Sequence, residues 1–228
     1  MRTQPNLRAR PRLTAALGLA LTTITLPIAA AGAANDGGAS PTAGPAHRKA
    51  RAADLQTTAK KFNVVKGGEA ALRGHYAPGT AGRTVSLEIN LGGEWVTRDT
   101  TTTDAGGDYR LAYTPKRTGG YATRVAIGSA AQDVGRLDVF RKARATWYGD
   151  GLYGNKLACG GTLTESTIGV ANKTLPCGTK ITLRYKGREL RVKVIDRGPF
   201  SDSLDYDLTS ATKQKLGYPD VGTVLATR

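Results

Sequence analysis

The stretch Leu190–Phe200, LRVKVIDRGPF, predicts how the C-terminal part of this 228-residue chain folds. Apolar and basic residues alternate over its first five positions, which is the period-two pattern of a β-strand with one buried face. Asp196 continues the parity of the apolar set, so its carboxylate points inward if the strand stays regular. A Gly-Pro pair then ends the strand. Asp196 is therefore a candidate functional residue, although it could instead pair with Arg197 or accept backbone N–H bonds in the turn.

Short strands surround this stretch in residues 143–228. Apolar spacing and turn signals predict strands at Ala145–Gly149, Ile168–Ala171, Ile181–Tyr185 and Val221–Ala226. A short helix is predicted at Thr209–Leu216, because Thr209 can cap its start and Gly217 can end it. About six strands and one helix in so short a segment predict a compact β-barrel.

The sequence of residues 61–141 predicts a second series of short strands separated by turns. Strands are predicted at Thr84–Leu91, Glu94–Thr97, Tyr109–Tyr113, Tyr121–Ile127 and Val134–Phe140. This spacing predicts a small antiparallel β-sandwich. The segment resembles bacterial immunoglobulin-like modules, in which a G-x-W strand leads to a T-D-x-x-G-x-Y turn, here Thr103–Tyr109. Its aromatic residues Trp95, Tyr109 and Tyr121 are expected to pack in the core, with a carbohydrate-binding surface as the alternative.

The first 60 residues are expected to direct and tether the chain. Residues 1–34 have the order of a secretory signal peptide, with four arginines followed by an apolar segment that closes in small residues. A transmembrane anchor is the alternative, and Pro27 and the short apolar core argue against it. Residues 35–60 lack apolar periodicity and predict a disordered basic linker. The mature chain is thus expected to be secreted or cell-wall associated, without a transmembrane span, and it is not expected to be a lipoprotein because the leader contains no cysteine.

The chain is strongly basic. Its formal net charge is +15, and removal of the four leader arginines from that charge leaves +11 on the exported part. A cationic exported protein concentrates on polyanions such as anionic wall polymers. No RNA-binding signature, basic helix or zinc-finger spacing is present, so nucleic acid is not an expected partner, and a monomer is expected.

The only cysteines are Cys159 and Cys177. Two cysteines in an exported chain predict one disulfide. A metal site is not expected because both histidines, His47 and His75, lie far upstream, and the same distance removes a base for a nucleophilic cysteine. No cofactor is expected.

Five motifs in the C-terminal segment resemble the rare lipoprotein A family, whose domain is a double-psi β-barrel related to expansin and barwin domains. They are T-W-Y-G at Thr146–Gly149, A-C-G at Ala158–Gly160, K-T-L-P-C-G-T at Lys173–Thr179, V-I-D-R-G-P-F at Val194–Phe200 and D-L-T at Asp207–Thr209. The predicted fold class is therefore all-β: an immunoglobulin-like β-sandwich at 61–141, followed at 143–228 by a six-stranded double-psi β-barrel with one short helix.

The resemblance implies a protein that acts on peptidoglycan glycan strands, and some family members are lytic transglycosylases that leave a 1,6-anhydro end. Asp196 falls on the family's key aspartate and is the expected general acid and base. Tyr148, Trp147, Asn172 and Asp207 are expected to bind substrate, although Trp147 could fill the barrel and Asp207 could bond the backbone near the helix start. The cysteines fit a variant in which they join two loops that flank the groove, as in expansin and barwin relatives.

Two positions depart from the family pattern. Active members carry a Glu and a His where this chain has Gly161 and Asn172, and Glu165 is a possible spatial substitute for the first. The alternative function is therefore a non-catalytic, expansin-like peptidoglycan-binding or wall-loosening module. A barwin-like inhibitory binder is a third option.

Overall fold

The computed structural model describes residues 49–77 and 80–228, so the expected signal peptide and most of the expected linker lie outside the described residues. Strands dominate the described part, and α1 (Ser210–Leu216) is its one α-helix. The fold is thus mostly β, as predicted. No helix in residues 49–77 and 80–228 is both long and apolar enough to cross a membrane.

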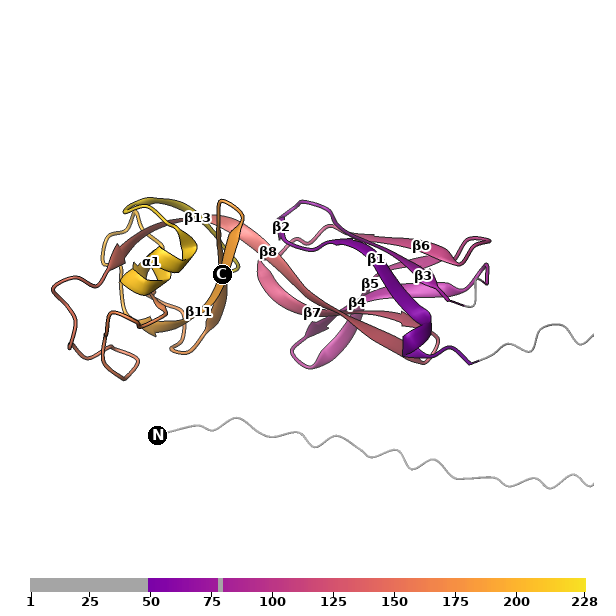
Figure 1. Ribbon diagram of the computed structural model, residues 1–228, viewed down its shortest axis with the longest axis horizontal. Helices are drawn as coiled ribbons and strands as arrows, with labels where there is room; N and C mark the ends of the chain where they lie inside the picture. The colour runs from indigo at the N-terminus through magenta and orange to yellow at the C-terminus, as the bar shows by residue number, and fades with distance from the viewer. Residues whose placement is uncertain (1–48, 78–79) are drawn as a thin grey trace, which may run out of the picture. The chain divides into compact units, whose positions relative to one another are not determined.

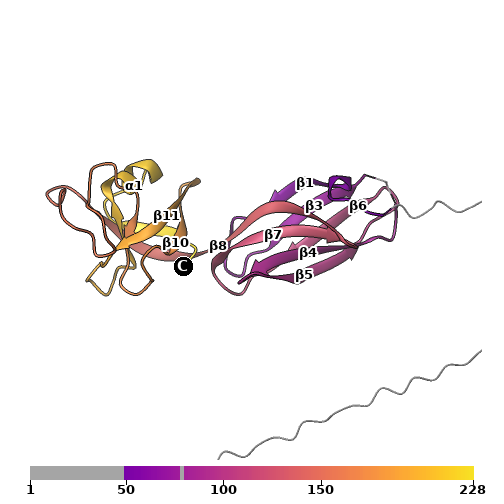
Figure 2. The same ribbon diagram turned by 90° about the horizontal axis from the view of Figure 1, so that it is seen from below.

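Two sheets form the N-terminal part, and their strands are antiparallel except for the short β2, which pairs with β8 in parallel. The first has the order β1-β3-β6, and β5, β4, β7 and the first half of β8 lie side by side in the second (Figure 2). The strands are β1 (Leu55–Lys61), β2 (Val64–Val65), β3 (Ala70–Tyr76), β4 (Thr84–Leu91), β5 (Glu94–Thr102), β6 (Asp108–Tyr113), β7 (Gly119–Ile127) and β8 (Ala130–Tyr148). Both sheets bury their alternating apolar residues in one hydrophobic core, to which Leu72, Leu87 and Leu111 contribute. Immunoglobulin-like topology stays a prediction.

The ordered chain begins earlier than the sequence predicts. Residues up to 60 are expected to be linker, but Ala52–Asp54 form a 3₁₀ helix and Leu55–Lys61 form β1. Leu55 is buried in the core, whereas most other residues of β1 are polar. Because β1 is an edge strand rich in Lys, Gln and Thr, its sequence gives little of the apolar alternation that marks a strand.

A single 19-residue strand, β8, replaces two predicted ones. Its first half pairs with β7 up to Val139, and its second half pairs with β13 and β12 from Arg141 to Tyr148. No glycine or proline interrupts the chain between Arg136 and Tyr148, so nothing in the sequence ends the strand there. The predicted domain boundary at 141–143 therefore falls inside a continuous strand.

The C-terminal strands close into a ring. Their order is β12-β9-β11-β10-β13-β8, and a further parallel pairing of β12 with β8 completes a six-stranded barrel. The additional strands are β9 (Val170–Ala171), β10 (Lys180–Tyr185), β11 (Arg188–Asp196), β12 (Tyr206–Thr209) and β13 (Gly222–Ala226). Val192 and Val194 are buried in a second core while Arg191 and Lys193 are exposed, which confirms the alternation expected for this stretch.

Local sequence signals fix the helix and the main turn of the barrel. Thr209 accepts a hydrogen bond from the backbone N–H of Thr212, and Gly217 has a φ of 64° at the end of α1. Figure 1 shows this helix. Lys186 and Gly187 both have positive φ, 45° and 84°, as a tight hairpin turn between β10 and β11 requires. These two features place β11 and β12, which carry the candidate site.

Candidate functional site

Two carboxylates lie in one row across the barrel wall. Asp196 of β11 pairs with Ala171 of β9, and Ala171 also pairs with Asp207 of β12. Paired residues on neighbouring strands share a face, so the three side chains point the same way. We call Asp196, Ala171 and Asp207 the carboxylate row. Two strand spacings put the aspartate backbones about 10 Å apart, with small Ala171 between them.

The carboxylate row faces away from the barrel core. Tyr206 and Leu208 flank Asp207 and are fully buried in the core, so Asp207 points outward. The inward direction expected for Asp196 is wrong, because the β9–β11 register shifts between Val194 and Asp196 and reverses the parity. This irregularity takes Asp196 out of the barrel interior and aligns it with Asp207.

Backbone donors hold one oxygen of Asp196. The N–H groups of Ala158 and Arg197 both donate to Oδ1, each at 2.9 Å. The Arg197 guanidinium bonds instead to the carbonyls of Asn172 and Leu175 at 3.2 and 3.1 Å. Of the two structural roles left open for Asp196, backbone bonding is therefore the one observed. Because both bonds use Oδ1, Oδ2 remains available to Tyr148 and to a ligand.

Two buried polar atoms on this face form no well-oriented hydrogen bond within the described residues, although one of them, the Tyr148 hydroxyl, lies close enough to the Asp196 carboxylate to interact with it. They are the hydroxyl of Tyr148 and Oδ1 of Asp207. Tyr148 pairs with Thr209 across β8 and β12, which puts its side chain on the face of the carboxylate row. Buried polar groups are nearly always paired, so these two atoms are candidates for hydrogen bonds to a bound ligand.

Burial shifts the proton equilibria of both residues. Desolvation raises the pKa of Asp207 above its ordinary value, because a buried carboxylate loses its hydration. Desolvation also raises the pKa of Tyr148, and the negative charge of Asp196, the contact of the hydroxyl with that carboxylate and the charge of Asp207 raise it further. Tyr148 therefore stays a hydrogen-bond donor, and Asp207 takes up a proton more readily than a solvated aspartate.

Asp207→Asn should increase stability at neutral pH. Below the unfolded-state pKa of about 3.9, Asp207 carries a proton whether the chain is folded or not. As the pH rises through the higher folded-state pKa, wild type loses stability and the amide variant does not. We expect a gain of no more than about 1 kcal/mol at pH 7, since the side chain is only half-buried. Thermal unfolding of both proteins at pH 3 and pH 7 measures this difference in stability. If Asp207→Asn is more stable than wild type by the same amount at both pH values, the pKa of Asp207 is not raised in the folded state.

Tyr148→Phe should leave stability unchanged or raise it by up to about 1 kcal/mol. Removing a buried hydroxyl that forms no well-oriented hydrogen bond within the described residues relieves a desolvation cost and loses only its contact with the Asp196 carboxylate. Tyr218→Phe is the matched control, because the Tyr218 hydroxyl donates to the carbonyl of Ala145 at 2.9 Å and its loss should cost about 1 kcal/mol. Urea unfolding measures the free energy of unfolding of both variants. Equal losses of stability would show that the Tyr148 hydroxyl also forms a stabilising hydrogen bond.

The other expected substrate-binding residues lie in different settings. The side chain of Asn172 is buried and bonds to backbone at both ends of its amide: Nδ2 donates to the Asp205 carbonyl, and Oδ1 accepts from Thr174 and Leu175. Trp147 points to the opposite side of β8 from Tyr148 and packs against the barrel core. Their binding of substrate stays a prediction.

Trp147 is held by charged neighbours at the helix. Its Nε1 donates to Asp220 at 2.8 Å, and the Lys213 ammonium lies 3.9 Å from the ring centroid. Lys213 also bonds to Asp220, and these two contacts lower the pKa of that exposed carboxyl group. The ring is thereby fixed beside α1 rather than on the carboxylate row.

The predicted disulfide between Cys159 and Cys177 is present. It joins the loop that supplies the Ala158 N–H donor to the loop before β10. Cys159 also donates its backbone N–H to the carbonyl of Ile195 at 3.2 Å, and Arg197 Nη2 donates to Cys177 Sγ at 3.2 Å. The crosslink therefore lies directly beside Asp196.

The family's Glu position differs in backbone as well as in side chain. Gly161 has a φ of 85°, a conformation that residues with a Cβ rarely adopt. Glu165 is exposed on the same loop. A glutamate could not simply be restored at position 161 without strain or a change in the loop.

Sequence reasoning missed the backbone parts of the site. The Ala158 N–H and the floor formed by Ala171 and Gly198 carry no chemical signature, although both lie in or next to recognised motifs. A Cβ on Gly198 would lie 3.6 Å from Asp207 Oδ2 and 3.8 Å from the Ala171 Cβ. Within residues 49–77 and 80–228, no three His, Cys, Asp or Glu side chains are grouped to hold a metal ion.

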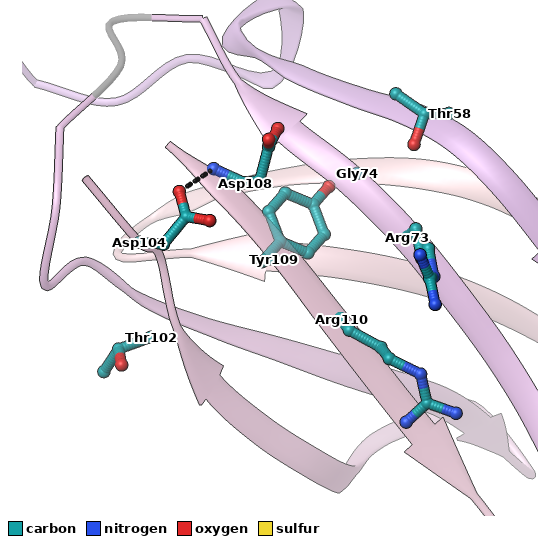
Figure 3. A pocket seen from close by; sticks show the side chains of 8 residues that line it. All are labelled: Thr58, Arg73, Gly74, Thr102, Asp104, Asp108, Tyr109 and Arg110. Atoms are coloured by element: carbon teal, nitrogen blue, oxygen red, sulfur yellow. Dashed lines mark hydrogen bonds between the residues drawn. The ribbon is translucent and has the colours of Figure 1, made fainter. Parts of the chain in front are cut away.

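The N-terminal sheets contain a separate pocket of about 640 Å³ (Figure 3). It is lined by Thr58, Arg73, Gly74, Thr102, Asp104, Asp108, Tyr109 and Arg110. Tyr109 is only 5% exposed and belongs to the core, as expected, and Gly74 leaves room for its ring. This pocket mixes two carboxylates with two guanidinium groups and is distinct from the carboxylate row.

Residues 141–226 match a family model of the double-psi β-barrel type described as lytic transglycolase. This confirms the resemblance of the C-terminal part to the rare lipoprotein A family. Curated proteins of this family are similar to the same part of the chain. The protein named endolytic peptidoglycan transglycosylase RlpA from Campylobacter jejuni is 33% identical over 105 residues, which are 45% of this chain and 34% of that protein.

Two further relatives and one solved structure are similar to the same part of the chain. The protein named probable endolytic peptidoglycan transglycosylase RlpA from Synechocystis is 32% identical over 46% of this chain and 36% of that protein. The RlpA of Pseudomonas aeruginosa is 38% identical over 35% of this chain and 24% of its own length. The solved Streptomyces papain inhibitor is 29% identical, with a TM-score of 0.32, over 38% of this chain and 93% of that one. The chain thus spans only about a third of the first two relatives' length.

Proposed function

We propose that the barrel cleaves peptidoglycan glycan strands as an endolytic, lytic transglycosylase-like enzyme, with Asp196 as general acid and base. The carboxyl group first protonates the leaving glycosidic oxygen between N-acetylmuramic acid and N-acetylglucosamine. As a carboxylate it then takes the proton from the sugar's own 6-hydroxyl, whose oxygen bonds to C1 and leaves a 1,6-anhydro end. A second carboxylate that acts as a nucleophile or activates water, as in ordinary glycosidases, is not needed.

The hydrogen bonds of Asp196 suit this exchange of one proton. Oδ1 already accepts two backbone N–H bonds, so the proton that Asp196 carries resides on Oδ2. Tyr148 lies beside this carboxyl group, because the pKa of Tyr148 is raised in part by the Asp196 carboxylate. A sugar above Ala171 would contact Oδ2 and the Tyr148 hydroxyl together.

Two buried polar atoms that form no well-oriented hydrogen bond within the described residues, the Tyr148 hydroxyl and Asp207 Oδ1, carry this proposal. Tyr148 donates to a substrate oxygen, and Asp207, in whichever protonation state it is found, offers an oxygen to a sugar hydroxyl or amide. Both residues orient the glycan while Asp196 moves the proton. Asn172 shapes the adjacent turn, and Trp147 could add contacts only beside α1.

A non-catalytic glycan-binding module is the second candidate. It is favoured by Gly161 and Asn172, which stand where active members of the family carry Glu and His. Asn172 bonds to the backbone through its whole amide and has no ionisable group with which to shuttle a proton. In that case the carboxylate row would hold the same polymer without cutting it.

The site of action follows from the same chemistry. Peptidoglycan lies outside the cytoplasmic membrane, and a disulfide persists in that oxidising compartment. Export by a cleavable signal peptide at 1–34, a monomeric mature chain and an immunoglobulin-like N-terminal domain belong to this proposal.

Incubation of the mature protein with purified sacculi tests the function. Mass spectrometry of the soluble products should find 1,6-anhydro-muropeptides, which hydrolysis by water would not produce. Co-sedimentation with the sacculi but no soluble product would establish the binding module instead. Neither product nor co-sedimentation would reject both functions.

A further inference from the structure

A pocket of about 700 Å³ at one end of the N-terminal sheets is lined mainly by basic residues. It lies among β2, the β6–β7 loop and β8, and we call it the basic pocket. Its lining residues are Val65, Lys66, Lys116, Arg117, Thr118, Phe140, Arg141 and Lys142. Five of these eight are cationic and none is acidic. The pocket in Figure 3, by contrast, contains two aspartates.

Backbone hydrogen bonds build the basic pocket rigidly. Lys66 donates its N–H to the Phe140 carbonyl at 2.8 Å, and Gly67 donates to the Pro115 carbonyl at 3.0 Å. These bonds tie β2 to β8 and to the β6–β7 loop. The Tyr121 hydroxyl also donates to the Thr118 carbonyl at 2.9 Å, so this bond attaches the loop that carries Lys116 and Arg117 to β7. The cations are thus presented by fixed backbone, which lowers the entropy cost of binding.

Most charges of the basic pocket have no partner in the described chain. Arg141 pairs with Asp205 at 3.0 Å, whereas Lys66, Lys116, Arg117 and Lys142 form no ion pair within residues 49–77 and 80–228. Other cations of the same sheets are paired, as in Arg110–Glu69, Arg124–Glu88 and Arg136–Asp138. Four unpaired like charges repel one another, and an anion bound among them relieves that repulsion.

The pocket also has an apolar side. Val65 is 46% exposed at its rim, while Phe140 beneath it is fully buried. Lysine and arginine side chains bind phosphate oxygens by charge-assisted hydrogen bonds. Exposed Val65 suits the carbon backbone between successive phosphates, and no exposed aromatic ring lines the pocket, within the described residues, on which a nucleic-acid base could stack.

We infer that the basic pocket binds a linear polyol phosphate, a phosphodiester-linked polymer without bases, and holds the protein on an envelope that carries it. This binding is independent of the proposed cleavage, because none of its residues belongs to the carboxylate row. Cations at the pocket replace the polymer's counterions, so affinity falls as salt rises.

The test uses the mature chain and a fluorescent poly(glycerol phosphate) oligomer, with anisotropy read at several salt concentrations. Lys66→Gln, Lys116→Gln and Arg117→Gln together should weaken binding roughly tenfold or more and reduce the log–log salt slope by about 2. The matched control removes three exposed cations from the barrel: Lys180→Gln, Arg191→Gln and Lys193→Gln. It should change affinity by less than about threefold.

Three results would overturn the inference. The first is an equal loss of affinity for the oligomer in the barrel control, and the second is no loss of affinity in the pocket variant. The third is that single-stranded DNA of the same length binds as tightly as the oligomer does. All six substituted side chains are exposed, and melting temperatures confirm that each variant folds. Product release from sacculi stripped of phosphate polymers should stay unchanged in the pocket variant, so failure of this site and failure of the proposed cleavage are separately visible.

Discussion

Asp196→Asn should lower the release of 1,6-anhydro products from sacculi by about 100- to 10,000-fold, the range that positioned acid–base groups contribute. The amide retains the shape of the carboxylate and can still accept both backbone bonds from Ala158 and Arg197 through its oxygen. It cannot give a proton to the glycosidic oxygen and recover it from the 6-hydroxyl. Stability should change little, and mass spectrometry of initial rates measures the effect.

Asp202→Asn is the control for this substitution. Asp202 lies shortly after Asp196 in sequence, its side chain is fully solvent-exposed, and it bonds to Lys173. The substitution removes the same charge without touching the carboxylate row, so its activity should remain near wild type. Equal activity of Asp196→Asn and wild type would remove Asp196 from the chemistry, whereas retained sacculus binding with no product from either protein would support the binding module.

Loss of the disulfide should have the second largest effect. Cys159→Ala with Cys177→Ala should lower the free energy of unfolding by about 3 kcal/mol, since the bond closes a loop with a sequence separation of 18. For a chain of this size that is a fall in Tm of about 10 °C. Product release should fall as well, because the loop that supplies the Ala158 N–H to Asp196 loses its crosslink.

Reduction of the wild type provides the matched comparison. A reductant should bring wild type to the stability and activity of the double variant and should leave the variant unchanged. If wild type in reductant keeps its Tm, the crosslink contributes no stability. If the variant keeps full activity at a temperature where it is folded, the disulfide does not position Asp196.

The sequence predicted the barrel well because its signals are local. Alternation over Leu190–Val194 and the capped helix each depend on neighbouring residues, and both are present. The disulfide followed from cysteine count and compartment. The edge strand β1 was missed because its polar composition gives little sign of a buried face, although Leu55 is deeply buried.

The site could be predicted only in part because its geometry depends on the pairing of distant strands. A single register irregularity after Val194 decides on which face of the barrel wall Asp196 lies, and the residue spacing of β11 does not predict this irregularity. The alignment of Asp196 with Asp207 through Ala171 joins three segments of the chain. Trp147 and Tyr148 are adjacent in sequence, yet strand alternation sends them to opposite faces.

The uninterrupted strand β8 limits how this protein can be rearranged. Residues near Lys142 are hydrogen-bonded into ladders on both sides of the expected junction, so no loop exists there at which a recombination event could cut cleanly. If the N-terminal sheets or the barrel were exchanged for an unrelated domain, the new β8 would have to keep the same alternation of side chains across the junction. A shift of one residue would turn Ala145 outward and Thr146 into the barrel.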